Sequence, residues 1–138
     1  MTDLIFAKQN LDGHTLVLCK DGKLLHSCKR GVMPMVDYIR ADICLNGFSA
    51  ADTIVGKAVA SMFVMCGIVA VFAKVISRQG LDYLRSHGVY VEYDLLTENI
   101  ENLQGTGICP MEEAVAALSD PQDCFAAVVR KIDSMRAD

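Results

Sequence analysis

The chain has 138 residues, of which 52% are hydrophobic and 22% are charged, and its formal net charge is −4. This length and composition predict one globular domain spanning residues 1–138, large enough to bury a core. The acidic balance excludes a general nucleic-acid-binding protein, which needs a basic face, but it leaves room for a local basic pocket that holds one phosphate.

The first quarter of the chain predicts a β-hairpin. Residues 2–9 form a mixed lead-in that is compatible with a short helix. Strand-like segments follow at His14–Cys19 and Lys23–Lys29, joined by Asp21-Gly22, which is a strong signal for a tight hairpin turn. Consecutive apolar residues in the first of these strands predict that both of its faces are covered.

Two helices are expected next. Pro34 opens a helix that runs to about Leu45, with its apolar residues at helical spacing. Ser49 and Asp52 match a loose capping box, which predicts a second helix from Ser49 to about Met65. This second helix is apolar nearly all round, as is typical of a central, buried helix.

The second half predicts a β-α-β unit followed by two helices. Apolar runs at Gly67–Lys74 and Val89–Tyr93 predict strands, and between them Ser77 caps a helix from Arg78 to about His87. Residues 94–104 form a polar connection with one helical turn expected around residues 98–103. Helices are then expected over Pro110–Leu118 and from Pro121 onward.

The predicted order is β-β-α-α-β-α-β-α-α. An antiparallel hairpin followed by a parallel β-α-β unit gives an α/β fold with three layers, α/β/α, around a mixed four-stranded sheet.

The sequence also predicts where the protein is found. Thr2 and Asp3 follow Met1, so we expect no signal peptide. The longest apolar run, Val59–Val71, is shorter than the roughly 18 residues that a transmembrane helix needs. We therefore expect a cytoplasmic protein with no membrane partner.

The cysteines form no C-x-x-C pair, and a reducing compartment predicts six buried, reduced thiols. Neither a metal site nor a cofactor is predicted. A zinc site assembled from scattered cysteines with His14, His26 and His87 is the alternative. The six cysteines are Cys19, Cys28, Cys44, Cys66, Cys109 and Cys124.

A candidate site lies at the start of the helix that Pro110 opens. Proline suits the first helical position, which makes Cys109 the N-cap and places Glu112 and Glu113 in the first turn. A thiol at a helix N-terminus tends to be reactive, so Cys109 is a candidate nucleophile. The alternative is a capped helix start with an inert, buried thiol.

Lys57 is the second feature of interest, because it is the only charged residue between Asp52 and Lys74. Such a lysine either extends its ammonium group to solvent or points at an anion. Gly56 beside it disfavours a helix interior by about 1 kcal/mol, which predicts that another group approaches closely there.

The order of elements is similar to the cytidine-deaminase-like fold, in which two helix N-termini converge on one pocket. In the zinc deaminases, the first start carries His-x-Glu or Cys-x-Glu and the second carries Pro-Cys-x-x-Cys. The matching places here are Gly56-Lys57-Ala58 and Cys109-Pro110-Met111-Glu112. The first has no metal ligand and no catalytic Glu, and the second has a single cysteine, so zinc-dependent deamination is not expected.

More closely, the chain resembles a small bacterial family within that superfamily that is known only as a domain of unknown function. The resemblance rests on Asp52–Ala58, on the β-α-β unit and on Gly105–Glu112. The family pattern has a basic residue after the asparagine at Asn102, where this chain has Leu103. The resemblance implies a pocket at the two helix starts, formed by Gly56, Lys57, Asn102, Gly105, Thr106, Gly107, Cys109 and Glu112.

The first functional hypothesis is binding of a small anionic or nucleotide-like ligand. Backbone N–H groups of the Pro110 helix start and of the turn at residues 105–107 would bind phosphate or carboxylate, and Lys57 would add charge. Glu112 would accept from an amino or ribose hydroxyl group, provided that Glu113 faces away. The alternative is an ion pair between Lys57 and Glu112 that ties two helices together.

Three further hypotheses remain open. One is an enzyme with Cys109 as nucleophile and Glu112 as a second catalytic candidate, which requires a base near the thiol. Another is a non-catalytic partner-binding or regulatory module, or a homo-oligomer, that uses an adaptable methionine surface. The last is a redox role of the thiols. The methionines considered for the surface are Met33, Met35, Met62 and Met65.

Overall fold

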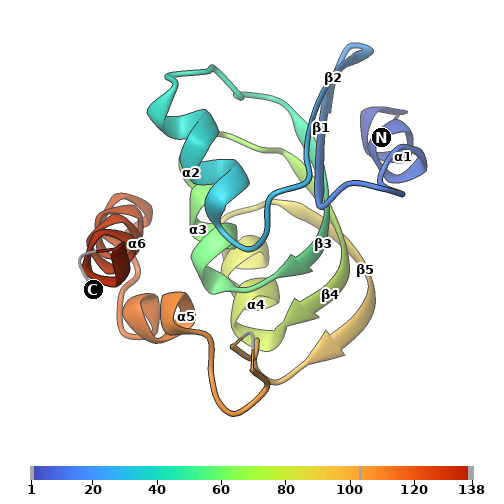
Figure 1. Cartoon of the computed structure of the whole chain (residues 1–138). Coiled ribbons are helices and arrows are strands. Elements are labelled where there is room, and N and C mark those ends of the chain that lie inside the picture. Colours follow the sequence, from blue (N-terminus) through green and yellow to red (C-terminus); the bar gives the residue numbers. More distant parts are fainter. Residues whose placement is uncertain (1, 103, 137–138) are drawn as a thin grey trace.

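The computed structural model describes residues 2–102 and 104–136 and shows an α/β fold around one five-stranded sheet (Figure 1). The strand order is β2-β1-β3-β4-β5, in which β2, β1 and β3 pair antiparallel while β3, β4 and β5 run parallel. The elements are α1 (Thr2–Gln9), β1 (Leu16–Lys20), β2 (Lys23–Ser27), α2 (Met33–Arg40), β3 (Ser49–Val55), α3 (Lys57–Met65), β4 (Ala70–Ser77), α4 (Arg78–Ser86), β5 (Tyr90–Thr97), α5 (Pro110–Val115) and α6 (Pro121–Arg136).

The predicted hairpin and the predicted parallel β-α-β unit are confirmed. The lead-in is the helix α1, and the hairpin of β1 and β2 turns at Asp21 and Gly22, whose φ angles are +51° and +80°. Positive φ at both central residues matches the right-handed twist of the paired strands, which explains the short turn. The parallel β-α-β unit of β4, α4 and β5 is present as well.

The predicted four-stranded sheet is wrong, because residues 49–55 form the strand β3 and not the start of a helix. Ser49 and Asp52 therefore do not make a capping box, and α3 begins only at Lys57. β3 lies between β1 and β4 and most of its residues are buried. Ser49 and Asp52 have the spacing of a helix N-terminus, and alanine favours a helix over a strand, so the local pattern indicates the wrong element here.

Several element ends also differ from prediction. α2 stops at Arg40, shortly before Asp42 adopts a φ of +57°, and α5 stops at Val115. β5 continues to Thr97, and the connection after it holds no helical turn in its described residues: Glu101 instead bridges to Ile108. Leu103, at the end of the predicted turn, lies outside the described residues.

Helices cover the sheet unevenly. α2 to α6 contribute to the larger core on one face, whereas Leu4 and Ala7 of α1 cover the other face together with Leu11 (Figure 1). Met35 and Met62 are fully buried in the larger core, so these two have the core-filling role that is usual for methionine and do not belong to a methionine surface. Within the described residues, no helix is long and apolar enough to cross a membrane.

Candidate functional site

The parallel strands bring three chain segments to one edge of the sheet. β3 runs through Gly56 into α3, β4 runs through Ser77 into α4, and β5 leads into the connection to α5. In open α/β sheets, ligands bind outside the carboxyl ends of the parallel strands. The predicted site residues lie at this edge.

Glu112 joins the two helix starts. One of its carboxylate oxygens accepts the backbone N–H of Lys57 at 2.7 Å, and the other accepts that of Ala58 at 3.1 Å. The first N–H groups of a helix have no partner within it, and Gly56, the N-cap of α3, has no side chain to offer. Glu112 therefore caps α3 from a different helix.

Gly56 is a glycine because of this contact. A Cβ at this position would overlap the Glu112 carboxylate, whose carbon would lie 2.5 Å away. The backbone of Gly56 also lies against Gly80 of α4, where a Cβ would come within 3.0 Å of the Gly56 carbonyl carbon. The predicted close approach at Gly56 is confirmed, although the residue joins a strand to a helix and is not inside a helix.

Burial and hydrogen bonding shift the pKa of Glu112 in opposite directions. Burial raises the pKa of this carboxyl above its ordinary value, because the charged form loses solvation. The N–H groups of Ala58 and Lys57 and the positive charge of Lys57 oppose the increase without cancelling it. Glu112 is thus a buried acid whose anion is stabilised by the start of α3.

Lys57 holds α5 at the opposite end from Glu112. Its Nζ donates to the carbonyl oxygen of Ala116 at 3.2 Å and lies 5.9 Å from the centre of the Tyr83 ring. Within the described residues, no ion pair joins Lys57 Nζ to Glu112. The two residues do tie the helices together, but through the backbone N–H of Lys57.

A small cavity of about 140 Å³ lies beside these groups. Its walls combine one ammonium group, two carboxylates, two side-chain amides and aliphatic surface. Glu113 belongs to this wall, so the condition that it face away from an anionic ligand is not met. The lining residues are Lys57, Gln79, Asn99, Ile100, Ile108, Glu112, Glu113 and Ala116.

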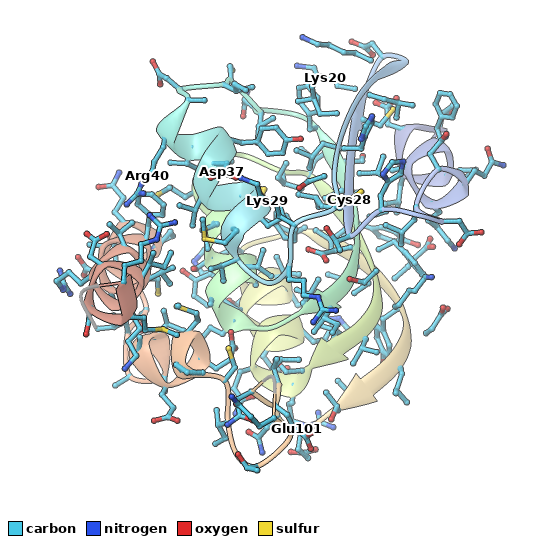
Figure 2. The ribbon with its side chains drawn as sticks, viewed as in Figure 1. Lys20, Cys28, Lys29, Asp37, Arg40 and Glu101 are labelled. Atoms are coloured by element: carbon cyan, nitrogen blue, oxygen red, sulfur yellow. The ribbon has the colours of Figure 1, made fainter. Side chains whose placement is uncertain are left out.

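The glycine turn forms a second, more open hollow of about 430 Å³ next to the cavity. Asn102 organises the turn, because its Oδ1 accepts the N–H of Thr106 at 3.0 Å and its backbone N–H donates to Gly107 at 2.8 Å. Gly105 and Glu101 also line this hollow, and Figure 2 shows Glu101 in the connection between β5 and α5.

The predicted residues therefore fall into separate groups. Lys57 and Glu112 line the cavity, Gly105, Thr106 and Gly107 line the hollow, and Asn102 shapes the turn. Sequence reasoning missed Gln79 and Asn99, which follow the ends of β4 and β5 closely. The available signal was their position after strands that end at the same edge.

Cys109 is the N-cap of α5, as predicted, and its carbonyl oxygen accepts the N–H groups of Glu112 and Glu113. Its half-buried thiol makes no hydrogen bond to any described residue and does not line the cavity. His14 contacts Cys28 and the ring of His26 beside the β1–β2 hairpin, and His87 makes its hydrogen bonds at the end of α4. The structure thus provides no histidine base for Cys109.

The described residues do not fit a zinc ion at this edge. Cys109 is the one cysteine, and there is no histidine, in the two segments Gly56–Ala58 and Cys109–Glu112. Across residues 2–102 and 104–136, no group of three His, Cys, Asp or Glu side chains is arranged to hold a metal ion.

The chain is similar to several solved structures. A DUF1893 family protein from Thermotoga maritima superposes with a TM-score of 0.86 at 26% identity, covering 94% of this chain and 90% of that one. Weaker similarity, with a TM-score of 0.46 at 17% identity over 67% of this chain, links it to two deaminases. These are the apo dCMP deaminase of cyanophage S-TIM5, of which 94% is covered, and the diaminohydroxyphosphoribosylaminopyrimidine deaminase/5-amino-6-(5-phosphoribosylamino)uracil reductase of Thermotoga maritima, of which 34% is covered.

No curated protein matches the sequence. A family described as a domain of unknown function (DUF1893) matches residues 5–132, which is nearly the whole chain. This confirms the predicted family resemblance: the chain belongs to the DUF1893 family.

Proposed function

We propose that the cavity beside Lys57 and Glu112 binds the base-like ring of a small nucleotide-like molecule. The observation that carries the proposal is the lining itself, which brings a lysine, two acids and two amides around one space at the carboxyl ends of β3, β4 and β5. A few convergent polar groups in a hollow with aliphatic walls are typical of small-molecule sites.

The size of the cavity supports a single ring. A cavity of about 150 Å³ admits a benzene-sized molecule, and drug-sized ligands occupy about 300 Å³ or more. The cavity here measures about 140 Å³. A base-sized ring would therefore fill it, while larger substituents would extend toward the open hollow around Gly105–Gly107.

The polar groups favour a ligand that carries donors as well as an anionic group. The start of α3 is already occupied by the Glu112 carboxylate, so a phosphate or carboxylate would meet Lys57 Nζ and not the helix N-terminus. Glu113 is exposed at the cavity wall and its carboxylate has free acceptor positions for amino groups. A simple anion would meet two acids here, which disfavours it.

Thermal shift with a graded panel tests the proposal. The panel contains cytosine, cytidine, CMP, adenine, adenosine, AMP and inorganic phosphate. A ligand that binds only the folded protein raises the melting temperature by mass action. We expect stabilisation by ring-bearing compounds, most by those with phosphate, and little by phosphate alone.

Two substitutions assign any binding to the cavity. Lys57→Met and Glu113→Gln should each reduce the shift, whereas Lys74→Met should leave it unchanged. Lys74 is a suitable control because it forms an exposed ion pair with Asp12 at 3.8 Å and does not line the cavity. Absence of a shift with every compound, or an equal shift in Lys57→Met, would overturn the proposal.

Binding of a partner protein and formation of a homo-oligomer both remain predictions. The place to examine is the sheet face that α1 leaves open, where Ile54, Val75 and Leu95 are register partners on adjacent strands. Ile54 and Leu95 are 52% and 58% exposed. Light scattering across protein concentrations would show whether this face mediates self-association.

A further inference from the structure

Two of the three histidines and an exposed cysteine meet beside the β1–β2 hairpin, away from the cavity. His14 precedes β1, His26 lies in β2, and Cys28 follows β2, so antiparallel pairing brings them together. Cys28 Sγ lies 3.5 Å from Nδ1 of His14. The rings of His14 and His26 stack with their centres 4.3 Å apart, which holds the His14 ring in place.

The other thiols lack this arrangement. Cys19 and Cys124 are fully buried, and burial raises the pKa of each. Burial also raises the pKa of Cys66, to about 11, with a further contribution from the charge of nearby Cys44. Cys28 and Cys44 are exposed, so the prediction that all six thiols are buried is wrong for these two. No described residue forms a hydrogen bond with the sulfur of Cys44. Cys28 is thus the accessible thiol that has a histidine at its sulfur.

The sequence around Cys28 contains more basic than acidic residues. The segment from Lys23 to Arg30 contains two lysines, one arginine and one histidine and no acidic residue. Figure 2 shows Cys28 at the hairpin and Lys29 at α2, where it pairs with Asp37 at 2.6 Å. Arg30 is the basic neighbour of Cys28 that forms no ion pair with a described residue.

We propose that Cys28 is a modification site for hydroperoxides, with His14 as its proton acceptor and donor. The thiol proton has two acceptors within reach, the Gly13 carbonyl oxygen at 3.3 Å and Nδ1 of His14 at 3.5 Å. Transfer to His14 leaves a thiolate beside an imidazolium ion, which is the arrangement that activates a cysteine nucleophile.

The peroxide is the only oxidant that the oxidation of Cys28 requires. The Cys28 thiolate attacks one peroxide oxygen, a sulfur–oxygen bond forms, and the oxygen–oxygen bond breaks. The leaving hydroxide or alkoxide takes the proton from the His14 imidazolium and departs as water or an alcohol. Cys28 becomes a sulfenic acid, which an external thiol reduces through a mixed disulfide because Cys28 is exposed.

Peroxide labelling of the full-length protein tests the proposal. The protein is treated with hydrogen peroxide and dimedone, and the labelling rate of each cysteine is followed by mass spectrometry. We expect the labelling rate of Cys28 to exceed that of Cys44 at least about tenfold, since positioned acid–base groups contribute at least this much. Equal rates at Cys28 and Cys44 would overturn the proposal.

Substitution of His14 tests whether Cys28 reacts because of this histidine or only because it is exposed. His14→Gln keeps a polar side chain but cannot take up the proton, so the Cys28 rate should fall to that of Cys44 while the melting temperature stays unchanged. His26→Ala, which removes the stacked ring alone, should give a smaller loss. An unchanged Cys28 rate in His14→Gln would overturn the role of His14.

Discussion

Gly56 is the residue at which the site tolerates least change. Alanine there would place its Cβ against the Glu112 carboxylate and would force this cap away from the N–H groups of Lys57 and Ala58. We expect Gly56→Ala to lower the free energy of unfolding by about 1–3 kcal/mol, measured by chemical denaturation.

Gly107→Ala is the matched control, because its Cβ would meet only Asn102 Nδ2 at 3.9 Å, an ordinary contact. A double-mutant cycle with Glu112→Ala gives the sharper result. If the overlap causes the loss, Gly56→Ala should cost much less once the carboxylate is gone. Additive losses would contradict this explanation.

Asp52 gives the protein a pH dependence of definite sign. It is only 6% exposed in β3, and burial raises its pKa to about 7, against a smaller opposing effect of the N–H groups of Ile54 and Thr53. The folded state therefore holds the proton more tightly than the unfolded state does. The corresponding stability is complete below the unfolded pKa of about 3.9 and is lost as the pH rises through about 7.

Asp52→Asn should flatten this profile. We expect the wild-type free energy of unfolding to fall between pH 4 and pH 7 relative to that of Asp52→Asn, measured by denaturant titration at each pH. Glu112, whose pKa is also raised, contributes in the same direction to both proteins. The difference between them therefore isolates Asp52, and parallel curves would show that Asp52 does not titrate in this range.

At the scale of elements, α5 acts as a clamp on the start of α3. Glu112 in its first turn accepts two N–H groups of α3, and Lys57 of α3 donates to the carbonyl oxygen of Ala116 at its end. A six-residue helix has little stability of its own, so these contacts hold it in place. The clamp also forms one wall of the cavity.

Loss of this clamp should be visible in hydrogen exchange. Glu112→Ala should speed exchange at the N–H groups of Lys57 and Ala58 and lower the free energy of unfolding by about 1–2 kcal/mol. Glu113→Ala is the control, because it removes an acid from the same turn whose side chain makes no hydrogen bond to a described residue. Equal protection in the two variants would show that Glu112 is not the cap.

Local patterns were sufficient for the elements that present one face to solvent. The Asp21-Gly22 turn, the Ser77 cap and the Pro110 helix start could each be predicted from a few adjacent residues. β3 could not, because Ser49 and Asp52 have the spacing of a helix N-terminus and the alanines between them favour a helix over a strand.

The site residues were also predictable only as far as local patterns reach. Lys57 and Glu112 stood out as charges in unusual local positions, but the use of Glu112 as a cap for another helix depends on a contact between residues that are 55 positions apart. Gln79 and Asn99 join them only because β3, β4 and β5 are neighbours in the sheet. Strand order is a property of the whole chain, so no local pattern could reveal it.

At the scale of the whole molecule, the second face of the sheet depends on α1. Leu4, which is 1% exposed, packs with Val17, Ala51 and Phe72 against the sheet, whereas its neighbour Ile5 is 55% exposed. Leu4→Ala should therefore lower the free energy of unfolding by about 2–5 kcal/mol, while Ile5→Ala should change it by less than about 0.5 kcal/mol.

Hydrogen exchange shows whether α1 opens alone or with the sheet. Because the larger core lies on the opposite face, we expect Leu4→Ala to accelerate exchange in α1 far more than in β3 or β4. This result would mean that α1 can detach while the cavity edge stays folded, so ligand-induced stabilisation should persist in the variant. Uniform acceleration across the sheet would instead show that both faces unfold as one cooperative unit.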